Sequence, residues 1–399
     1  MQRIAFLALS QAHQHLHWLP AALRLARRPD VEVTVLSGSR AGLDFIRSYD
    51  RDGRLKYRHL WAPSLSRDGL FTPPKRRLTL LLHHRAIGRF PVIVTTETTS
   101  SLLYRMPGFT SRMVHLKHGA GDREGGYNPK HARFDLTLVN GAKDKERLIA
   151  RGLATERNCL VVGYGKFELV RPPAPVFADD KPVALYNPHF DPNLSPWFGH
   201  AQQIVEAMER ITDWNFVVAP HVKTKHGPKV HAAAANVLVD PGSVRSIDMS
   251  YAEAASVYIG DVSSQVYEFL RRPRPCVFLN LDRVAWRGNE NYEHWKLGQI
   301  VESLDELEQA LRRAREVQPQ FEAAQRKAVA LSIAPTDGRA SQLQAEVILA
   351  FAEGPAALDA WIESHAAGAT DGSTPERALF PRLARHRDPQ ARPKRTGSR

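Results

Sequence analysis

The sequence predicts an α/β protein of two domains, each a parallel β-sheet covered by helices. Three observations favour this fold class. At 399 residues the chain is longer than one hydrophobic core usually organises. In each half, short apolar runs alternate with amphipathic helical patterns, as they do around parallel sheets. A proline-rich break at Arg171–Pro175 separates the two halves, because such a segment continues neither helix nor sheet.

Residues 1–170 are expected to form the first domain. Short apolar runs bounded by turn residues predict its strands, and apolar residues spaced three and four apart predict its helices. The predicted strands are Ile4–Leu9, Val31–Leu36, Leu55–Leu60, Val92–Thr96, Met113–Lys117, Leu136–Val139 and Leu160–Val162, and the predicted helices are Trp18–Arg27, Ala41–Tyr49, Lys75–Ile87 and Lys143–Arg151. The apolar start, Arg3–Leu9, passes into a polar, histidine-rich stretch, which favours a first strand over a signal peptide.

Residues 171–180 are expected to be a linker and residues 181–338 a second domain. Its predicted strands are Val183–Tyr186, Phe216–Ala219, Val237–Val239, Val257–Gly260 and Cys276–Leu279, and its predicted helices are Trp197–Ile211, Val230–Ala235, Ser250–Ala254, Ser264–Arg271 and Leu304–Glu316. A further helix, residues 339–365, is expected to pack back over both domains. Both domains are thus Rossmann-like, and two such units in tandem place the carboxyl ends of their sheets across a cleft, where open α/β sheets bind ligands.

The chain carries a net charge of +13, from 55 Lys and Arg against 42 Asp and Glu. This balance indicates an anionic partner: a phosphorylated substrate, a negatively charged membrane surface or nucleic acid. Few aromatic residues accompany the basic ones, which ranks nucleic acid last and predicts that it is not a partner. No stretch is long and apolar enough to span a bilayer, so any membrane contact is expected to be peripheral.

The tail, residues 366–399, is rich in basic residues and poor in apolar ones, which predicts disorder. Such a tail either contacts anionic lipid or only adds solubility. The two cysteines, Cys159 and Cys276, each precede an apolar run. We expect both to be small core residues of a protein in the reducing cytoplasm, rather than a disulfide or a metal site.

The stretch Asp261–Leu270 follows a buried strand and then takes helical spacing. The serines Ser263 and Ser264 therefore lie at a strand-to-helix junction, where unpaired backbone N–H groups and small hydroxyls suit a phosphate. We interpret the junction, including Asp261, as a seat for a phosphate or pyrophosphate. The alternative is that Asp261 or Ser263 only caps the helix.

A histidine flanked by glycine follows an earlier strand, in the segment His115–Arg123. Gly119 lets the backbone turn sharply after His118, and Asp122 is close enough in sequence to orient the imidazole. This arrangement is typical of a general base. A simple turn with an exposed histidine is the alternative.

Two further strand ends carry groups that suit a diphosphate. His221 and Lys223 follow Ala219, and both donate charge-assisted hydrogen bonds when protonated. A solvated basic loop, running on to His226, is the alternative. Asn187 and His189 follow the strand that opens the second domain and are expected to face the same cleft as substrate contacts.

Three histidines follow the first strand at alternate positions, His13, His15 and His17. Neither their spacing nor an accompanying carboxylate matches a familiar metal site. We therefore expect a loop of polar side chains lining the cleft, with His15 and His17 in contact with substrate at most. No residue is predicted to bind a metal ion and no cofactor is expected beyond a nucleotide-activated donor, while the sequence leaves open whether the reaction requires a metal ion.

Taken together, the motifs resemble those of the CDP-glycerol glycerophosphotransferases, which are teichoic-acid-type polymerases and primases and related capsule enzymes. The resemblance runs mainly from His115 to Ser341 and is strongest from Ser246 to Asn280. The motifs that carry it, in order, are His118-Gly119, Tyr186-Asn187-Pro188, Pro220-His221, Gly260-Asp261-Val262-Ser263-Ser264 and Asp337-Gly338-Arg339-Ala340-Ser341. Their order and spacing are more specific than any single motif.

The resemblance implies a two-domain fold of the GT-B type whose carboxyl-terminal half holds CDP-glycerol. The signature histidines of the family look like His118 and His221, and its phosphate-binding serines look like Ser263 and Ser264. By this similarity the hydroxyl of a cell-surface polymer or lipid-linked acceptor attacks the phosphorus that bears glycerol, and CMP leaves. It also implies a cytoplasmic enzyme that works at the inner face of the plasma membrane.

Three positions depart from the family pattern: Asn187-Pro188-His189 replaces Pro-Thr-aromatic-Arg, Val262 replaces an aromatic residue and Glu268 replaces an aspartate. Since fold does not determine chemistry, a nucleotide-sugar glycosyltransferase or a relative of the UDP-sugar 2-epimerases is the alternative. A non-enzymatic protein that binds polyanions comes last. Release of CMP or of UDP distinguishes the two enzymes.

Overall fold

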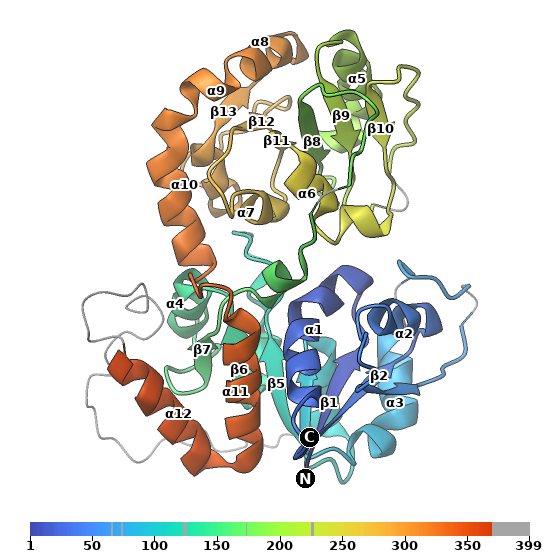
Figure 1. Ribbon diagram of the computed structural model, residues 1–399, viewed down its shortest axis with the longest axis vertical. Coiled ribbons are helices and arrows are strands. Elements are labelled where there is room, and N and C mark those ends of the chain that lie inside the picture. The colour runs from blue at the N-terminus through green and yellow to red at the C-terminus, as the bar shows by residue number, and fades with distance from the viewer. Residues whose placement is uncertain (65–66, 73–74, 123–125, 173, 225–226, 369–399) are drawn as a thin grey trace, which may run out of the picture.

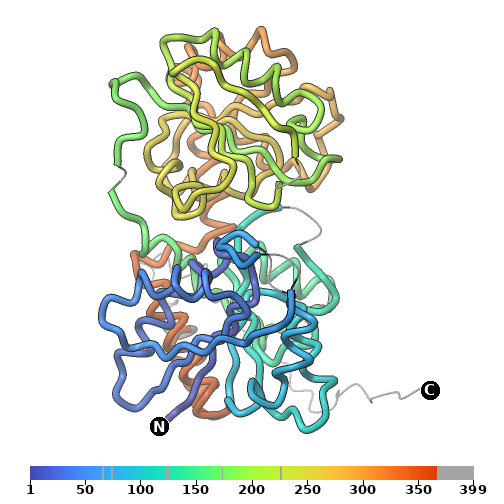
Figure 2. The backbone as a smooth tube through the Cα atoms, turned by 90° about the vertical axis from the view of Figure 1, so that its right-hand side faces the viewer, coloured from blue at the N-terminus to red at the C-terminus, as the bar shows by residue number. Residues whose placement is uncertain are grey.

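The computed structural model describes residues 1–64, 67–72, 75–122, 126–172, 174–224 and 227–368. Two domains stack along the long axis of the molecule (Figure 1), and the view turned by 90° shows the same separation (Figure 2). The chain crosses between them after residue 169 and returns after residue 332. Most of the predicted tail, residues 369–399, lies outside the described residues, as do Arg123, Pro173, Lys225 and His226.

The N-terminal domain holds a seven-stranded sheet in the order β3-β2-β1-β4-β5-β6-β7, with every pair parallel. The strands are β1 (Gln2–Ala8), β2 (Val31–Ser37), β3 (Lys56–His59), β4 (Val92–Thr95), β5 (Arg112–Leu116), β6 (Leu136–Val139) and β7 (Cys159–Val161). The connecting helices are α1 (Ala12–Ala26), α2 (Arg40–Arg47), α3 (Arg76–Ile87) and α4 (Ala142–Ala150), with 3-10 helices η1 (Thr99–Arg105), η3 (Pro129–Arg133) and η4 (Gly165–Leu169).

The C-terminal domain holds a six-stranded parallel sheet in the order β10-β9-β8-β11-β12-β13. The strands are β8 (Val183–Asn187), β9 (Asn215–Val218), β10 (Val237–Val239), β11 (Val257–Gly260), β12 (Cys276–Leu279) and β13 (Gln299–Val301). The helices are α5 (Trp197–Arg210), α6 (Ser250–Ala254), α7 (Gln265–Phe269), α8 (Leu307–Arg312), α9 (Ala314–Val317) and α10 (Pro319–Ser332), with 3-10 helices η5 (Val244–Ser246), η6 (Glu290–Leu297) and η7 (Leu304–Glu306). The predicted class of two parallel α/β domains is therefore confirmed.

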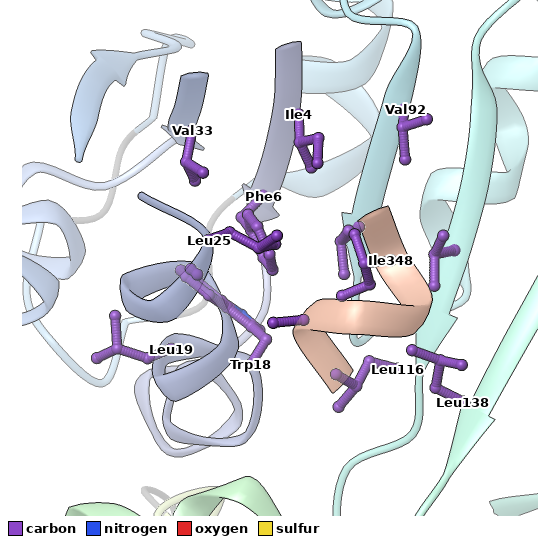
Figure 3. Close-up of a cluster of buried hydrophobic side chains, with 14 of the residues drawn as sticks. Ile4, Phe6, Trp18, Leu19, Leu25, Val33, Val92, Leu116, Leu138 and Ile348 are labelled. Carbon is purple, nitrogen blue, oxygen red and sulfur yellow. The ribbon is translucent and has the colours of Figure 1, made fainter. Parts of the chain in front are cut away.

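The last two helices, α11 (Ala340–Glu353) and α12 (Pro355–Gly368), return to the N-terminal domain. The expected single helix is divided at Gly354, whose φ of 137° no other residue adopts readily. Ile348 of α11 is fully buried with Leu116 and Leu138 of the sheet, in the same cluster as Phe6 and Trp18 (Figure 3). The C-terminus of the described chain thus completes the core of the first domain.

The helix predicted at Val230–Ala235 does not form, and that prediction was wrong. The side chains of α5 take the backbone N–H groups of this segment: His231 N donates to Gln202 Oε1 at 3.1 Å, and Ala234 N donates to Glu209 Oε1 at 2.9 Å. Backbone donors that side chains already satisfy gain little from helix formation.

Helix α1 begins at Ala12, six residues before the predicted start at Trp18. The three histidines predicted in a loop therefore lie on its first turns. Their polar side chains interrupted the apolar pattern because this end of the helix faces the cleft rather than the core. No helix of the described residues is long and apolar enough to cross a membrane.

Candidate active site

A pocket lies between the two domains, at the carboxyl ends of both sheets. The N-terminal domain contributes side chains from the start of α1, the loop after β5 and the segment around η4, including His13, His17, Lys117, His118, Tyr164 and Lys166. The C-terminal domain contributes the loops after β8, β9 and β11, including His189, Phe190, His221, Lys223, Ser264 and Glu268. Both predicted signature histidines therefore line one pocket, from opposite domains.

His118 is held in one tautomer by its two hydrogen bonds. Its Nδ1 donates to the backbone carbonyl of Thr96 at 2.8 Å, since a carbonyl can only accept. Its Nε2 then carries the lone pair and accepts from the side-chain amide of Gln14 at 2.9 Å. Burial, helped by the charge of Lys223, lowers the pKa of His118 to about 3. The imidazole is thus neutral. Its basic Nε2 faces the amide of Gln14, and a hydroxyl group could donate to Nε2 in place of that amide.

His13 lies between the two signature histidines. Its ring centroid is 6.4 Å from that of His118 and 5.3 Å from that of His221. Burial and then the neighbouring His221 hold the pKa of His13 well below its ordinary value. His221 Nδ1 accepts from Lys223 N at 3.1 Å, which leaves its Nε2 as the proton-bearing nitrogen. The rings of His118, His13 and His221 therefore lie in a row across the pocket. At one end His118 Nε2 is a proton acceptor from the N-terminal domain, and at the other His221 Nε2 is a proton donor from the C-terminal domain.

The loop after β5 lies close to the serine turn of the C-terminal domain. Gly119 takes a φ of +68°, the left-handed region that favours glycine. A Cβ at Gly121 would lie 2.6 Å from Cβ of Ser264, closer than side-chain atoms pack. The glycines thus allow His118 and Ser264 to line the same pocket.

Of the two serines, only Ser264 lines the pocket. Ser263 is buried, and its hydroxyl donates to Asn187 Oδ1 at 2.6 Å, while Asn187 Nδ2 donates to the carbonyl of Ala219 at 2.6 Å. The two side chains thus hold the loops after β8, β9 and β11 together behind the pocket. This differs from the predicted phosphate contact of Ser263 and the predicted substrate contact of Asn187, because both polar groups are used within the domain.

Asp261 also lies behind the pocket and is fully buried. Its carboxylate accepts from His189 N at 2.9 Å and Ser263 N at 3.2 Å, and from the hydroxyl of Ser195. Burial raises the pKa of Asp261 to about 6, although the hydrogen bonds from Ser195 and His189 oppose the shift. This differs from the predicted phosphate contact of Asp261, because the carboxylate is enclosed and holds the strand ends in place.

Asp122 does not orient His118, and that prediction was wrong. Its carboxylate accepts from Lys143 Nζ at 2.8 Å, from Tyr267 Oη at 2.5 Å and from His294 Nδ1 at 3.2 Å. The turn at Gly119 directs Asp122 toward α7 and η6 of the other domain, and the carbonyl of Thr96 takes the orienting role. Asp122 thus joins the two domains through hydrogen bonds with both.

His15 and His17 separate on α1. Residues four apart share a helix face, so His17 lines the pocket with His13, whereas His15 points away. His15 Nδ1 lies 3.3 Å from the Ser10 hydroxyl, and burial lowers its pKa to about 3. The predicted substrate contact of His15 is therefore not possible in this structure, because the side chain is enclosed.

Sequence reasoning missed a buried ion pair in the pocket wall. Lys166 Nζ contacts both oxygens of Glu268, at 2.7 and 2.8 Å, and Tyr164 Oη donates to Oε1 of the same carboxylate at 2.7 Å. Tyr164 and Lys166 come from the N-terminal domain and Glu268 from α7. The Gly163-Tyr164-Gly165-Lys166 run directly after β7 was the available signal, since glycines at a strand end mark a close approach.

A second, more apolar cavity lies behind α7 at the crossing of the chain, lined in part by Phe167, Leu270, Val329 and Ile333. It contains none of the predicted site residues. Within the described part of the chain, no three His, Cys, Asp or Glu side chains converge as a metal site would require.

Part of the chain matches a known protein family. Residues 177–350 match the family model described as CDP-Glycerol:Poly(glycerophosphate) glycerophosphotransferase. No sequence among curated proteins matches the chain significantly.

Solved structures share the two-domain fold. The wall teichoic acid polymerase TagF, soaked with CDPG, has a TM-score of 0.63 at 13% identity, over 88% of this chain and 89% of that chain. S. aureus MnaA with UDP has a TM-score of 0.62 at 13% identity, over 89% and 98%. A UDP-N-acetylglucosamine 2-epimerase has a TM-score of 0.58 at 16% identity, over 89% and 98%. At such identities the likeness concerns the fold. The match makes residues 177–350, which carry His221, Lys223 and Ser264, similar to the CDP-glycerol glycerophosphotransferases.

Proposed function

We propose that the protein transfers glycerophosphate from CDP-glycerol to a hydroxyl of a cell-surface polymer or lipid-linked acceptor at the cytoplasmic face of the membrane, and releases CMP. The family match supports the donor class, because it covers the half that carries His221, Lys223 and Ser264. One observation carries the proposal furthest. His118, whose basic Nε2 accepts from the side-chain amide of Gln14, lines the same pocket as these three donors but comes from the other domain.

In this mechanism the C-terminal side of the pocket binds the diphosphate. His221, Lys223 and the hydroxyl of Ser264 donate hydrogen bonds to its oxygens and offset the charge that gathers on the leaving phosphate. The acceptor hydroxyl enters from the N-terminal side. It displaces the amide of Gln14 and donates its own proton toward Nε2 of His118.

The transfer step forms one bond to phosphorus and breaks one. A bond forms between the acceptor oxygen and the phosphorus that bears glycerol, the bond from that phosphorus to the bridging oxygen breaks, and CMP leaves with the bridging oxygen. His118 Nε2 receives the proton of the hydroxyl, while the carbonyl of Thr96 keeps accepting from Nδ1 and stabilises the imidazolium. The low pKa of His118 arises from burial and the nearby Lys223. A bound diphosphate therefore raises that pKa, because its negative charge neutralises the cation.

Nucleotide release by the purified protein tests this function. CDP-glycerol, CDP-ribitol and a panel of UDP-, GDP- and dTDP-sugars are offered with a membrane fraction as acceptor. The proposal expects CMP from CDP-glycerol and no nucleoside diphosphate from the sugars. UDP released from a UDP-sugar, or its epimerisation, would instead favour the alternative enzymes that share the fold.

A further inference from the structure

Helix α3 carries a row of exposed leucines on its outer face. Leu78, Leu81 and Leu82 are 37, 47 and 55% exposed, and the spacing of three and four places them on one side of the helix. Trp61, which is 63% exposed, is joined to the same helix, because His83 Nε2 donates to the Trp61 carbonyl at 2.7 Å. Of the seven large apolar side chains exposed among the described residues, these four gather on one surface, called the α3 surface below.

The α3 surface is not needed to hold the helix in place. The opposite face of α3 buries Leu80 and Ile87 completely, in the core on the sheet face away from α1 and α11. A surface helix of a globular protein usually presents one apolar stripe, toward its core. A second apolar stripe on the same helix indicates contact with something outside the chain.

The positive charge around these leucines indicates that the contacting partner is anionic. Residues 69–96 contain no Asp or Glu but five cations, Lys75, Arg76, Arg77, Arg85 and Arg89. Arg76 is used internally, since its Nε donates to the Leu9 carbonyl at 2.7 Å. The other four are exposed and form no ion pair with any described residue. The leucines are thus surrounded by cations without counter-charges.

We propose that the α3 surface docks the protein on an anionic lipid bilayer. Leucine and tryptophan side chains enter the headgroup region, where Trp is favoured, and the surrounding cations contact lipid phosphates. A second copy of the chain fits less well, because a two-fold contact would bring the same unpaired cations against each other.

The position of α3 suits this role. It lies on the outer flank of the N-terminal domain, at the right in Figure 1 and facing the viewer in Figure 2. Trp61 and Lys75 also line a surface hollow with Ser39, at the carboxyl ends of β2 and β3. Those strand ends lie on the same edge of the sheet as the pocket between the domains. The bilayer would therefore meet the domain that supplies His118. The inference stands independently of the donor, since binding is measured without substrate.

Vesicle sedimentation with the full chain tests it. The probes are vesicles of phosphatidylcholine alone and of phosphatidylcholine with phosphatidylglycerol. We expect binding to the anionic vesicles, reduced at least about tenfold in the double variant Leu81→Glu/Leu82→Glu. Leu331→Glu is the matched control, because Leu331 is 43% exposed on α10 of the other domain and should bind as the unchanged protein does. Arg77→Gln/Arg85→Gln should weaken only the salt-sensitive part of the binding.

Other results would overturn the inference. One is equal binding by the Leu81→Glu/Leu82→Glu variant, with loss of binding in a full-length variant whose tail arginines Arg382, Arg385 and Arg387 are changed to Gln. A second is the absence of binding to either vesicle. A third is a dimer in solution that the Leu81→Glu/Leu82→Glu change dissociates, which would assign the surface to a second copy. Circular dichroism of each variant confirms that it folds, and CMP release from CDP-glycerol reports separately on the proposed function.

Discussion

Asp122 and Asp261 are both buried carboxylates beside the pocket, but they bind different kinds of partner. Asp122 accepts from Lys143 in its own domain and from Tyr267 and His294 in the other, so it ties the domains together. Asp261 accepts from two backbone amides and the Ser195 hydroxyl, all within the C-terminal domain.

The two environments shift the two pKa values in opposite directions. Burial alone would raise the pKa of Asp122, but the hydrogen bond from His294 and the charge of Lys143 hold it below its ordinary range. Asp261 has mainly neutral donors, so burial prevails and raises its pKa to about 6. A buried carboxylate thus stays charged where a cation contacts it, as at Asp122. Where its donors are neutral, as at Asp261, burial favours the protonated form. Neither one touches His118.

The largest expected effect is on His118 itself. His118→Ala should lower turnover by roughly 10²–10⁴-fold, because the general base is lost, while leaving donor affinity nearly unchanged. Steady-state kinetics of CMP release and calorimetric titration with CDP-glycerol measure the two quantities. Unchanged turnover would remove His118 from the mechanism.

Asp122→Ala should destabilise the protein by about 3–5 kcal/mol, since it leaves Lys143 buried without its partner and Tyr267 without an acceptor. Urea denaturation measures the free energy of unfolding. Asp122→Asn is the control, because an amide oxygen still accepts from Tyr267. A variant as stable as the original but as slow as His118→Ala would restore Asp122 as the group that orients the base.

The comparison also predicts opposite pH dependences. Between about pH 4 and the folded pKa of about 6, folded Asp261 binds a proton that the unfolded chain does not, so stability falls by roughly 2–3 kcal/mol as pH rises through this window. Asp122, whose pKa is lowered, stabilises fully above its unfolded pKa and loses that stabilisation as pH falls through its folded pKa.

Asp261→Asn should therefore remove the fall in stability between pH 4 and 6, and Asp122→Asn should not. Urea denaturation at several pH values across this window measures both. Parallel curves for Asp261→Asn and the original protein would show that Asp261 is charged throughout.

The smallest effects separate the two serines. Ser264→Ala should weaken donor binding by roughly 1 kcal/mol, or about fivefold, since one hydrogen bond to the diphosphate is lost. Ser263→Ala should instead lower stability by a similar amount, because Asn187 loses its buried partner. Titration and urea denaturation of both variants measure this. The reverse assignment would place Ser263 against the donor.

Much of the fold could be predicted from the sequence, because parallel strands buried on both faces are continuous apolar runs. The strand Val257–Gly260 was predicted with the bounds it has, and so were Leu136–Val139 and Cys276–Leu279. The first helix was predicted too short, because His13 and His17 face a cleft and interrupt the apolar pattern. A helix was predicted at Val230–Ala235 because the sequence does not show that the side chains of Gln202 and Glu209 accept from its backbone N–H groups.

The candidate site divides in the same way. The sequence by itself determined that His118, His221, Lys223 and Ser264 follow strands, and the carboxyl ends of parallel strands meet at one edge of a sheet. Only the tertiary structure decided which neighbours they have. The carbonyl of Thr96, not Asp122, orients His118, since hydrogen-bond partners depend on where a turn such as Gly119 directs the chain. The pair of Lys166 and Glu268 joins residues about a hundred positions apart, and only the packing of two domains brings their charges together.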